Sequence, residues 1–205
     1  MRLIGFYNYT VILTYLSLVS SAVGMLCACR GKFGDAIACL MLSGVCDMFD
    51  GVVARTKKDR TQDEKNFGIQ LDSLCDVVCF GVFPTVFLYF RGVNGLLGTA
   101  ALIFYILCAV IRLAFFNVLE TNRQTTQGGC AKGYRGLPVT TAAIILPALF
   151  LLGAVLPQSV EWALDHAYPA AVGFLFVLDF PVPKPDIGGM LQREKPGAES
   201  VPLEK

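Results

Sequence analysis

Charged residues are scarce in this chain, and the usual signs of a soluble or zinc-binding protein are missing. Only 16% of the 205 residues are charged, and the net charge of +1 gives no reason to expect a nucleic-acid partner. There is one histidine and no Cys-x2-Cys pair, which excludes the common zinc-binding patterns. The cysteines lie mostly within apolar stretches, where they are typical of small buried residues. No small-residue cleavage site follows the first apolar run, so we expect no secretory signal.

Apolar residues dominate instead. They make up 55% of the chain, and the mean hydropathy is +0.59. The length accommodates about six helices of roughly 20 residues, each long enough to cross a bilayer. We therefore predict an all-α integral membrane protein with six transmembrane helices. The predicted helices cover residues 7–29, 35–55, 67–90, 96–119, 137–156 and 160–178.

The C-terminal end of the chain differs from the rest. Pro181, Pro183 and Pro185 stop the last predicted helix, and polar residues follow. We predict a membrane domain at 1–185 and a polar, disordered tail at 186–205. Lys and Arg concentrate in the predicted loops 56–66 and 120–136 and in the tail. The positive-inside rule then predicts a multi-pass protein with these loops in the cytoplasm.

Four aspartates lie in stretches that are otherwise apolar enough to cross a membrane. Asp47 and Asp50 are three residues apart, and Asp72 and Asp76 are four apart, so each pair shares one helix face. Carboxylates at bilayer depth are costly unless they are paired, hydrated or bound to a cation. Oxygen ligands favour Mg²⁺, Mn²⁺ or Ca²⁺ over zinc. Helix capping or pairing with a nearby Lys or Arg explains one such aspartate but not four, so we predict a divalent-metal site.

The residues around the aspartates form a long motif. It reads Asp47-x2-Asp50-Gly51-x2-Ala54-Arg55, then Gly68-x3-Asp72-x3-Asp76. This motif resembles that of the membrane CDP-alcohol phosphatidyltransferases, although the twelve residues at 56–67 are more than this family usually has between its halves. The segments 111–118 (IRLAFFNV), 134–143 (YRGLPVTTAA) and 181–185 (PVPKP) resemble the phosphatidylserine synthase branch.

The resemblance implies transfer of a phosphatidyl group from CDP-diacylglycerol to L-serine, with release of CMP. It implies a homodimer of the six-helix CDP-alcohol phosphatidyltransferase fold in membrane lipid, with an active site that faces the cytoplasm. Two divalent cations, Mg²⁺ or Mn²⁺, are implied as cofactors: Asp47, Asp50 and Asp72 would hold the first, and Asp47, Asp72 and Asp76 the second. Asp76 would also be the catalytic base. The expected CDP-diacylglycerol contacts are Gly51, Ala54, Arg55 and Gly68.

Serine recognition requires a cation for the carboxylate. Arg112 lies in an apolar predicted helix, where a charge needs an anionic partner. Arg135 and Lys132 stand at the entrance of the next helix, where free backbone N–H groups also favour anions. We predict that these three residues bind serine. In the competing interpretations, Arg112 pairs with one of the aspartates, and Lys132 and Arg135 anchor the chain near lipid headgroups.

Two other functions compete with the serine transferase. The same chemistry could use another alcohol, such as glycerol 3-phosphate or an inositol phosphate, but a phosphorylated acceptor needs a denser basic pocket. A cation-coupled transporter could use the carboxylates as an ion relay, but the aspartate pattern has no second copy of the kind that transporter repeats show. The sequence leaves open a single displacement or a covalent phosphatidyl-enzyme, and we take the single displacement as the default.

Overall fold

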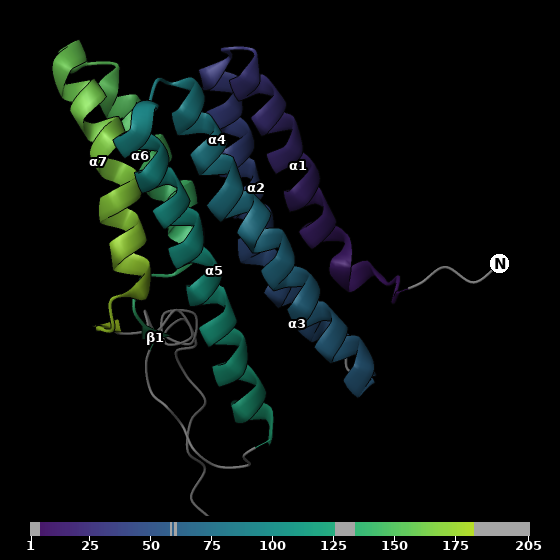
Figure 1. The fold of residues 1–205 in the computed structure, drawn as a ribbon. Coiled ribbons are helices and arrows are strands. Elements are labelled where there is room, and N and C mark those ends of the chain that lie inside the picture. The colour runs from purple at the N-terminus through teal and green to yellow at the C-terminus, as the bar shows by residue number, and fades with distance from the viewer. Residues whose placement is uncertain (1–4, 58, 60, 126–133, 183–205) are drawn as a thin grey trace, which may run out of the picture.

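The computed structural model describes residues 5–57, 59, 61–125 and 134–182. Six helical rods run alongside one another in a bundle (Figure 1), which confirms the predicted all-α fold. Four rods are long and apolar enough to cross a membrane: Tyr9–Cys29, Phe33–Ala54, Gln62–Phe90 and Gly95–Leu119. The fifth rod contains the apolar segment Val139–Gly153, which is shorter, and the sixth carries the acidic residues Glu161 and Asp165.

The rods follow one another in chain order. The first two are α1, Ile12–Cys29, after a 3-10 turn at Tyr9–Val11, and α2, Phe33–Thr56. The third joins α3, Gln62–Asp76, the π-helical segment η2, Val77–Val82, and α4, Phe83–Phe90. The others are α5, Gly95–Thr125, then α6, Ala142–Gly153, after a 3-10 turn (η3) at Val139–Thr141, and α7, Gln158–Val177. Strands β1, Tyr134–Arg135, and β2, Pro181–Val182, form a short antiparallel pair.

Two helices extend beyond the apolar stretches that predicted them. α3 begins at Gln62 rather than at residue 67, because Thr61 forms a capping box with Glu64. The Thr61 side chain accepts from the Glu64 N–H at 3.2 Å, and the Glu64 carboxylate accepts from the Thr61 N–H at 3.0 Å. α5 continues to Thr125 rather than ending at residue 119. The predicted tail at 186–205 lies outside the described residues.

Two glycines allow helices to pack at close range. A Cβ atom at Gly24 would lie 2.3 Å from the Phe83 ring and 2.8 Å from Cβ of Cys39, so α1 packs tightly against α2 and α4 there. A Cβ atom at Gly44 would lie 2.5 Å from Cβ of Ala143, where α2 meets α6. Small residues at such crossings are how membrane helices gain packing energy without a hydrophobic driving force.

The third rod changes its helical pitch just beyond Asp76. Pro84 has no N–H to donate to the carbonyl of Phe80, four residues earlier. That carbonyl accepts instead from the Tyr105 hydroxyl of α5, at 2.8 Å, and Tyr105 is fully buried. This hydrogen bond therefore connects the rod that carries Asp72 and Asp76 to α5. Short π-helical segments are frequent near functional sites.

Candidate active site

The structure brings the four aspartates together between α2 and α3. One carboxylate oxygen from each of Asp47, Asp50 and Asp72 lies within 4.8 Å of the other two. The side chain of Asp76 contacts that of Asp47, and the side chain of Asp50 contacts that of Asp72. Asp76 is the deepest of the four, with 8% of its surface exposed. The two acidic helix faces thus meet as their spacing predicts.

These carboxylates have no cationic partner among the side chains that the structure describes. The ion pairs found there join Lys57 to Glu64 and Arg91 to Glu161 and Asp165, away from the cluster. Four carboxyl groups in contact repel one another when ionised, and a bound cation would offset that repulsion. A set of oxygen donors at this separation suits a hard divalent cation such as Mg²⁺ or Mn²⁺.

A hydroxyl group from α1 completes the surroundings of Asp50. Thr14 is buried, and its Oγ1 donates to Oδ2 of Asp50 at 3.0 Å. One and two turns further along α1, Ser17 and Ser21 bond to the hydroxyl of Ser43 on α2, at 2.7 and 2.9 Å. Our sequence interpretation missed Thr14, although Thr14, Ser17 and Ser21 recur every three or four residues in an apolar helix, which indicates a buried polar face.

The glycines and alanine of the motif lie beside the acidic cluster. Nothing lies within 4 Å of the place where a Cβ atom at Gly51 would sit, so the α2 surface next to Asp50 is open. Ala54 and Gly68 are partly exposed. Arg55 belongs to α2, and its side chain is outside the described part of the structure. Of the predicted CDP-diacylglycerol contacts, Gly51 is therefore the one for which the structure shows free space.

Arg112 does not pair with an aspartate of the cluster. Its guanidinium donates from Nε to the carbonyl of Leu137 at 3.2 Å and from Nη2 to the carbonyl of Gly136 at 3.4 Å. The competing interpretation, in which an aspartate of the cluster neutralises Arg112, is therefore not what the structure shows. Arg135 lies in β1 next to Gly136, and its side chain is not described. Lys132 falls outside the described residues.

Two hydrogen bonds between α5 and the third rod place Arg112 at the level of the acidic cluster. Helix α5 touches the third rod through Tyr105, which bonds to Phe80, and through Asn117, whose Oδ1 accepts from Ser73 Oγ at 2.8 Å. Arg112 lies between those two positions on α5, and Asp76 lies between the matching positions on the third rod. The predicted serine-binding arginine and the predicted base are thus at the same level of the bundle.

The family match and the relatives of this chain agree with each other. Residues 7–177 match the family described as CDP-alcohol phosphatidyltransferase. The chain is 33% identical over 157 residues to an archaetidylserine synthase from Methanothermobacter thermautotrophicus, covering 74% of this chain and 61% of that protein. It is 32% identical over 171 residues to a CDP-diacylglycerol–serine O-phosphatidyltransferase from Methanocaldococcus jannaschii, covering 83% and 72%.

A bacterial relative extends the comparison. A CDP-diacylglycerol–serine O-phosphatidyltransferase from Helicobacter pylori is 32% identical over 148 residues, which cover 71% of this chain and 58% of that protein. The chain thus spans about three fifths of the length of the first and third of these relatives. No solved structure matches it.

Proposed function

The chain belongs to the CDP-alcohol phosphatidyltransferase family, and on that premise we propose that it transfers the phosphatidyl group of CDP-diacylglycerol to L-serine. The products are phosphatidylserine and CMP. The observation that carries the proposal is the convergence of four aspartates, in helices long and apolar enough to cross a membrane, without a cationic partner among the described side chains. The names of the relatives support serine as the acceptor.

The proposed reaction is a single displacement at phosphorus. The serine Oγ forms a bond to the phosphorus that carries the diacylglycerol, and the bond from that phosphorus to the oxygen of CMP breaks. The hydroxyl proton passes to the carboxylate of Asp76. A serine hydroxyl is a poor nucleophile, and a carboxylate positioned to accept its proton activates it. CMP departs with the electron pair of the broken bond. Divalent cations bound to the carboxylates would neutralise charge on the diphosphate and on the departing CMP.

The remaining predicted residues bind the substrates in this proposal. Asp47, Asp50 and Asp72 would hold one cation, and Asp47, Asp72 and Asp76 would hold the other. The open surface at Gly51, with Ala54, Arg55 and Gly68, receives the nucleotide and its diphosphate. Arg112, Arg135 and Lys132 bind the carboxylate of serine.

The setting of the site in the membrane is also part of the proposal. The protein works as a homodimer in lipid, with the acidic end of the bundle open to the cytoplasm. This orientation follows the excess of Lys and Arg in the loops at that end, such as the turn that holds Lys57.

The direct test is CMP release from CDP-diacylglycerol by the purified full chain in detergent, with Mn²⁺ or Mg²⁺. L-serine, glycerol 3-phosphate and inositol phosphate are supplied in separate reactions. We expect L-serine alone to stimulate CMP release, and Asp76→Asn to lower the rate at least about 100-fold, the usual contribution of a general base. Asp35→Asn is the matched control, because Asp35 is exposed in the first turn of α2, at the opposite end of that helix.

Each other outcome has a definite meaning. Stimulation by a phosphorylated alcohol would keep the transferase and overturn serine as its acceptor. CMP release in the absence of any acceptor, with radiolabelled lipid retained on the denatured protein, would replace the single displacement by a covalent intermediate. Folded protein that binds Mn²⁺ but releases no CMP with any acceptor would contradict the proposal.

A further inference from the structure

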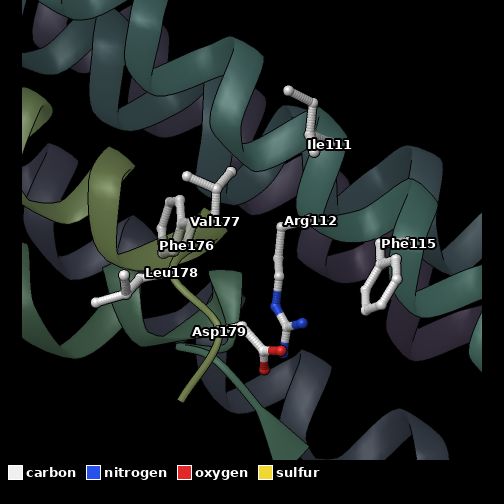
Figure 2. Close-up of a pocket in the computed structure, with 7 residues that line it drawn as sticks. All are labelled: Ile111, Arg112, Phe115, Phe176, Val177, Leu178 and Asp179. Atoms are coloured by element: carbon white, nitrogen blue, oxygen red, sulfur yellow. The ribbon is translucent and has the colours of Figure 1, made fainter.

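A pocket of about 210 Å³ lies between the C-terminal half of α5 and the residues that end α7. Figure 2 shows its lining, in which apolar side chains surround two charged groups, the guanidinium of Arg112 and the carboxylate of Asp179. The other lining residues are Ile111, Phe115, Phe176, Val177 and Leu178. Asp179 was not among the residues that the sequence pointed to.

The guanidinium is held firmly at the base of this pocket. Arg112 is 7% exposed, and its bonds to the carbonyls of Gly136 and Leu137 fix one side of the group. An arginine has five N–H donors, so this arrangement leaves donors for an anion. Asp179 stands beside the guanidinium in Figure 2.

The backbone around Gly136 keeps Arg112 and Asp179 next to each other. Gly136 has a φ of +73°, and a Cβ atom there would lie 2.8 Å from the carbonyl oxygen of Leu178. Its N–H donates to the carbonyl of Phe180 at 2.8 Å. The segment that carries the partners of Arg112 is thereby attached to the residues on both sides of Asp179. The two charges therefore belong to one built arrangement.

We propose that this pocket binds the zwitterionic end of the amino-acid acceptor, with Arg112 on the α-carboxylate and Asp179 on the α-ammonium. This rests on the proposed function, and it adds Asp179 as the residue that selects for an amino acid. Arginine binds carboxylates in a fixed fork geometry, and a carboxylate is the natural acceptor for an ammonium group. The volume admits several water-sized groups, which is enough for the seven non-hydrogen atoms of serine.

Asp179 also explains how a phosphorylated acceptor would be rejected. Glycerol 3-phosphate and inositol phosphate would be attracted by Arg112 but carry no ammonium to meet the carboxylate of Asp179. The phosphate, which carries more negative charge than a carboxylate, would then lie near the carboxylate of Asp179, and charges of the same sign repel. Specificity of this kind comes from a repulsive element as well as from an attractive one.

The test compares L-serine with 3-hydroxypropionate, which has the same hydroxyl and carboxylate but no ammonium. We expect Asp179→Asn to reduce the ratio of kcat/KM for L-serine to that for 3-hydroxypropionate at least tenfold, chiefly through a higher KM for L-serine. Asp179→Glu, which keeps the charge, should restore most of the ratio. Asp35→Asn, an exposed carboxylate elsewhere, should keep the wild-type ratio.

A second measurement does not depend on turnover. L-serine should raise the thermal midpoint of the detergent-solubilised wild-type protein and should not raise that of Asp179→Asn. If the wild type is stabilised by L-serine but releases no CMP with it, the proposed function fails and the pocket assignment stands. An equal loss of kcat/KM for both acceptors in Asp179→Asn leaves the ratio unchanged and would show a merely structural role. An unchanged ratio, or a wild-type thermal midpoint that L-serine does not raise, would overturn the assignment.

Discussion

Two clusters of buried charge in this bundle are built in opposite ways. At the turn between α4 and α5, one arginine meets two acidic side chains of α7, so charges of opposite sign are paired. Between α2 and α3, four acidic side chains meet one another, so charges of the same sign are brought together. The first arrangement pairs its charges within the protein, whereas the second is compatible with a cation bound from outside.

The paired cluster centres on Arg91. Its Nε donates to Oδ2 of Asp165 at 2.8 Å, and its Nη2 donates to Glu161. Burial lowers the pKa of Arg91, but the two hydrogen bonds to carboxylates raise it by more than burial lowers it. The pKa therefore lies above its usual value, and the guanidinium stays charged. The guanidinium also lies 5.2 to 5.7 Å from the centroids of three aromatic rings, those of Phe33, Phe87 and Phe150.

The difference between the clusters separates stability from function. Arg91 connects α2, α4, α6 and α7 through contacts that the folded protein satisfies by itself. The aspartates place unfavourable repulsion in the fold, which is expected where a ligand will later relieve it. The following substitutions test this contrast, from the largest expected effect to the smallest.

Arg91→Ala should cause the largest loss of stability. The substitution leaves Asp165 and Glu161 without their cation, and Asp165 is 12% exposed in its side chain. Removal of one partner from a buried pair lowers the free energy of unfolding by about 3 to 5 kcal/mol. Thermal denaturation in detergent measures this. Arg30→Ala, at the exposed turn between α1 and α2, is the control, and an equal loss in both variants would contradict the role given to Arg91.

Asp47→Asn should behave in the opposite way. Without divalent cations, the variant should be at least as stable as the wild type, because one of four repelling charges is gone. With Mn²⁺ at 100 times its dissociation constant, the wild type should gain about 2.7 kcal/mol of stability, and the variant should gain much less. A titration of the thermal midpoint with Mn²⁺ distinguishes the two. Loss of stability in the metal-free variant, similar to that of Arg91→Ala, would show that the aspartates stabilise the fold.

Thr14→Val should give a smaller effect on the same cluster. The substitution keeps the shape of the side chain and removes the hydrogen bond to Asp50. Loss of a residue that orients a metal ligand typically weakens metal binding about 10- to 100-fold. Electron paramagnetic resonance of Mn²⁺ measures the affinity directly, without turnover.

Two variants serve as controls for Thr14→Val. Thr14→Ser retains the hydroxyl and should keep most of the affinity. Ser20→Ala removes a buried hydroxyl that bonds to the Cys39 carbonyl instead, and it should leave Mn²⁺ binding unchanged. Equal Mn²⁺ affinity in Thr14→Val and Thr14→Ser would rule out an orienting role for the hydroxyl.

The local patterns of the sequence were enough to predict the helices and the acidic faces. Hydropathy and the 3.6-residue period depend on residues close together in the chain, and they indicate six helices with Asp47 and Asp50 on one face and Asp72 and Asp76 on another. The start of α3 at Gln62, rather than at residue 67, could also have been predicted from the sequence, because Thr61 and Glu64 have the spacing of a capping box. These features are properties of single segments, so no knowledge of packing is needed.

By itself, then, the sequence determined the membrane class, the helices and the pairs of carboxylates, because each of these is a local property. The tertiary structure alone decided which distant groups meet. Thr14 reaches Asp50 across 36 residues, Arg91 reaches Asp165 across 74, and Arg112 lies with Gly136 and Asp179 rather than with the aspartates. Such contacts depend on how helices cross and rotate against one another, and that is set by the packing of the whole bundle.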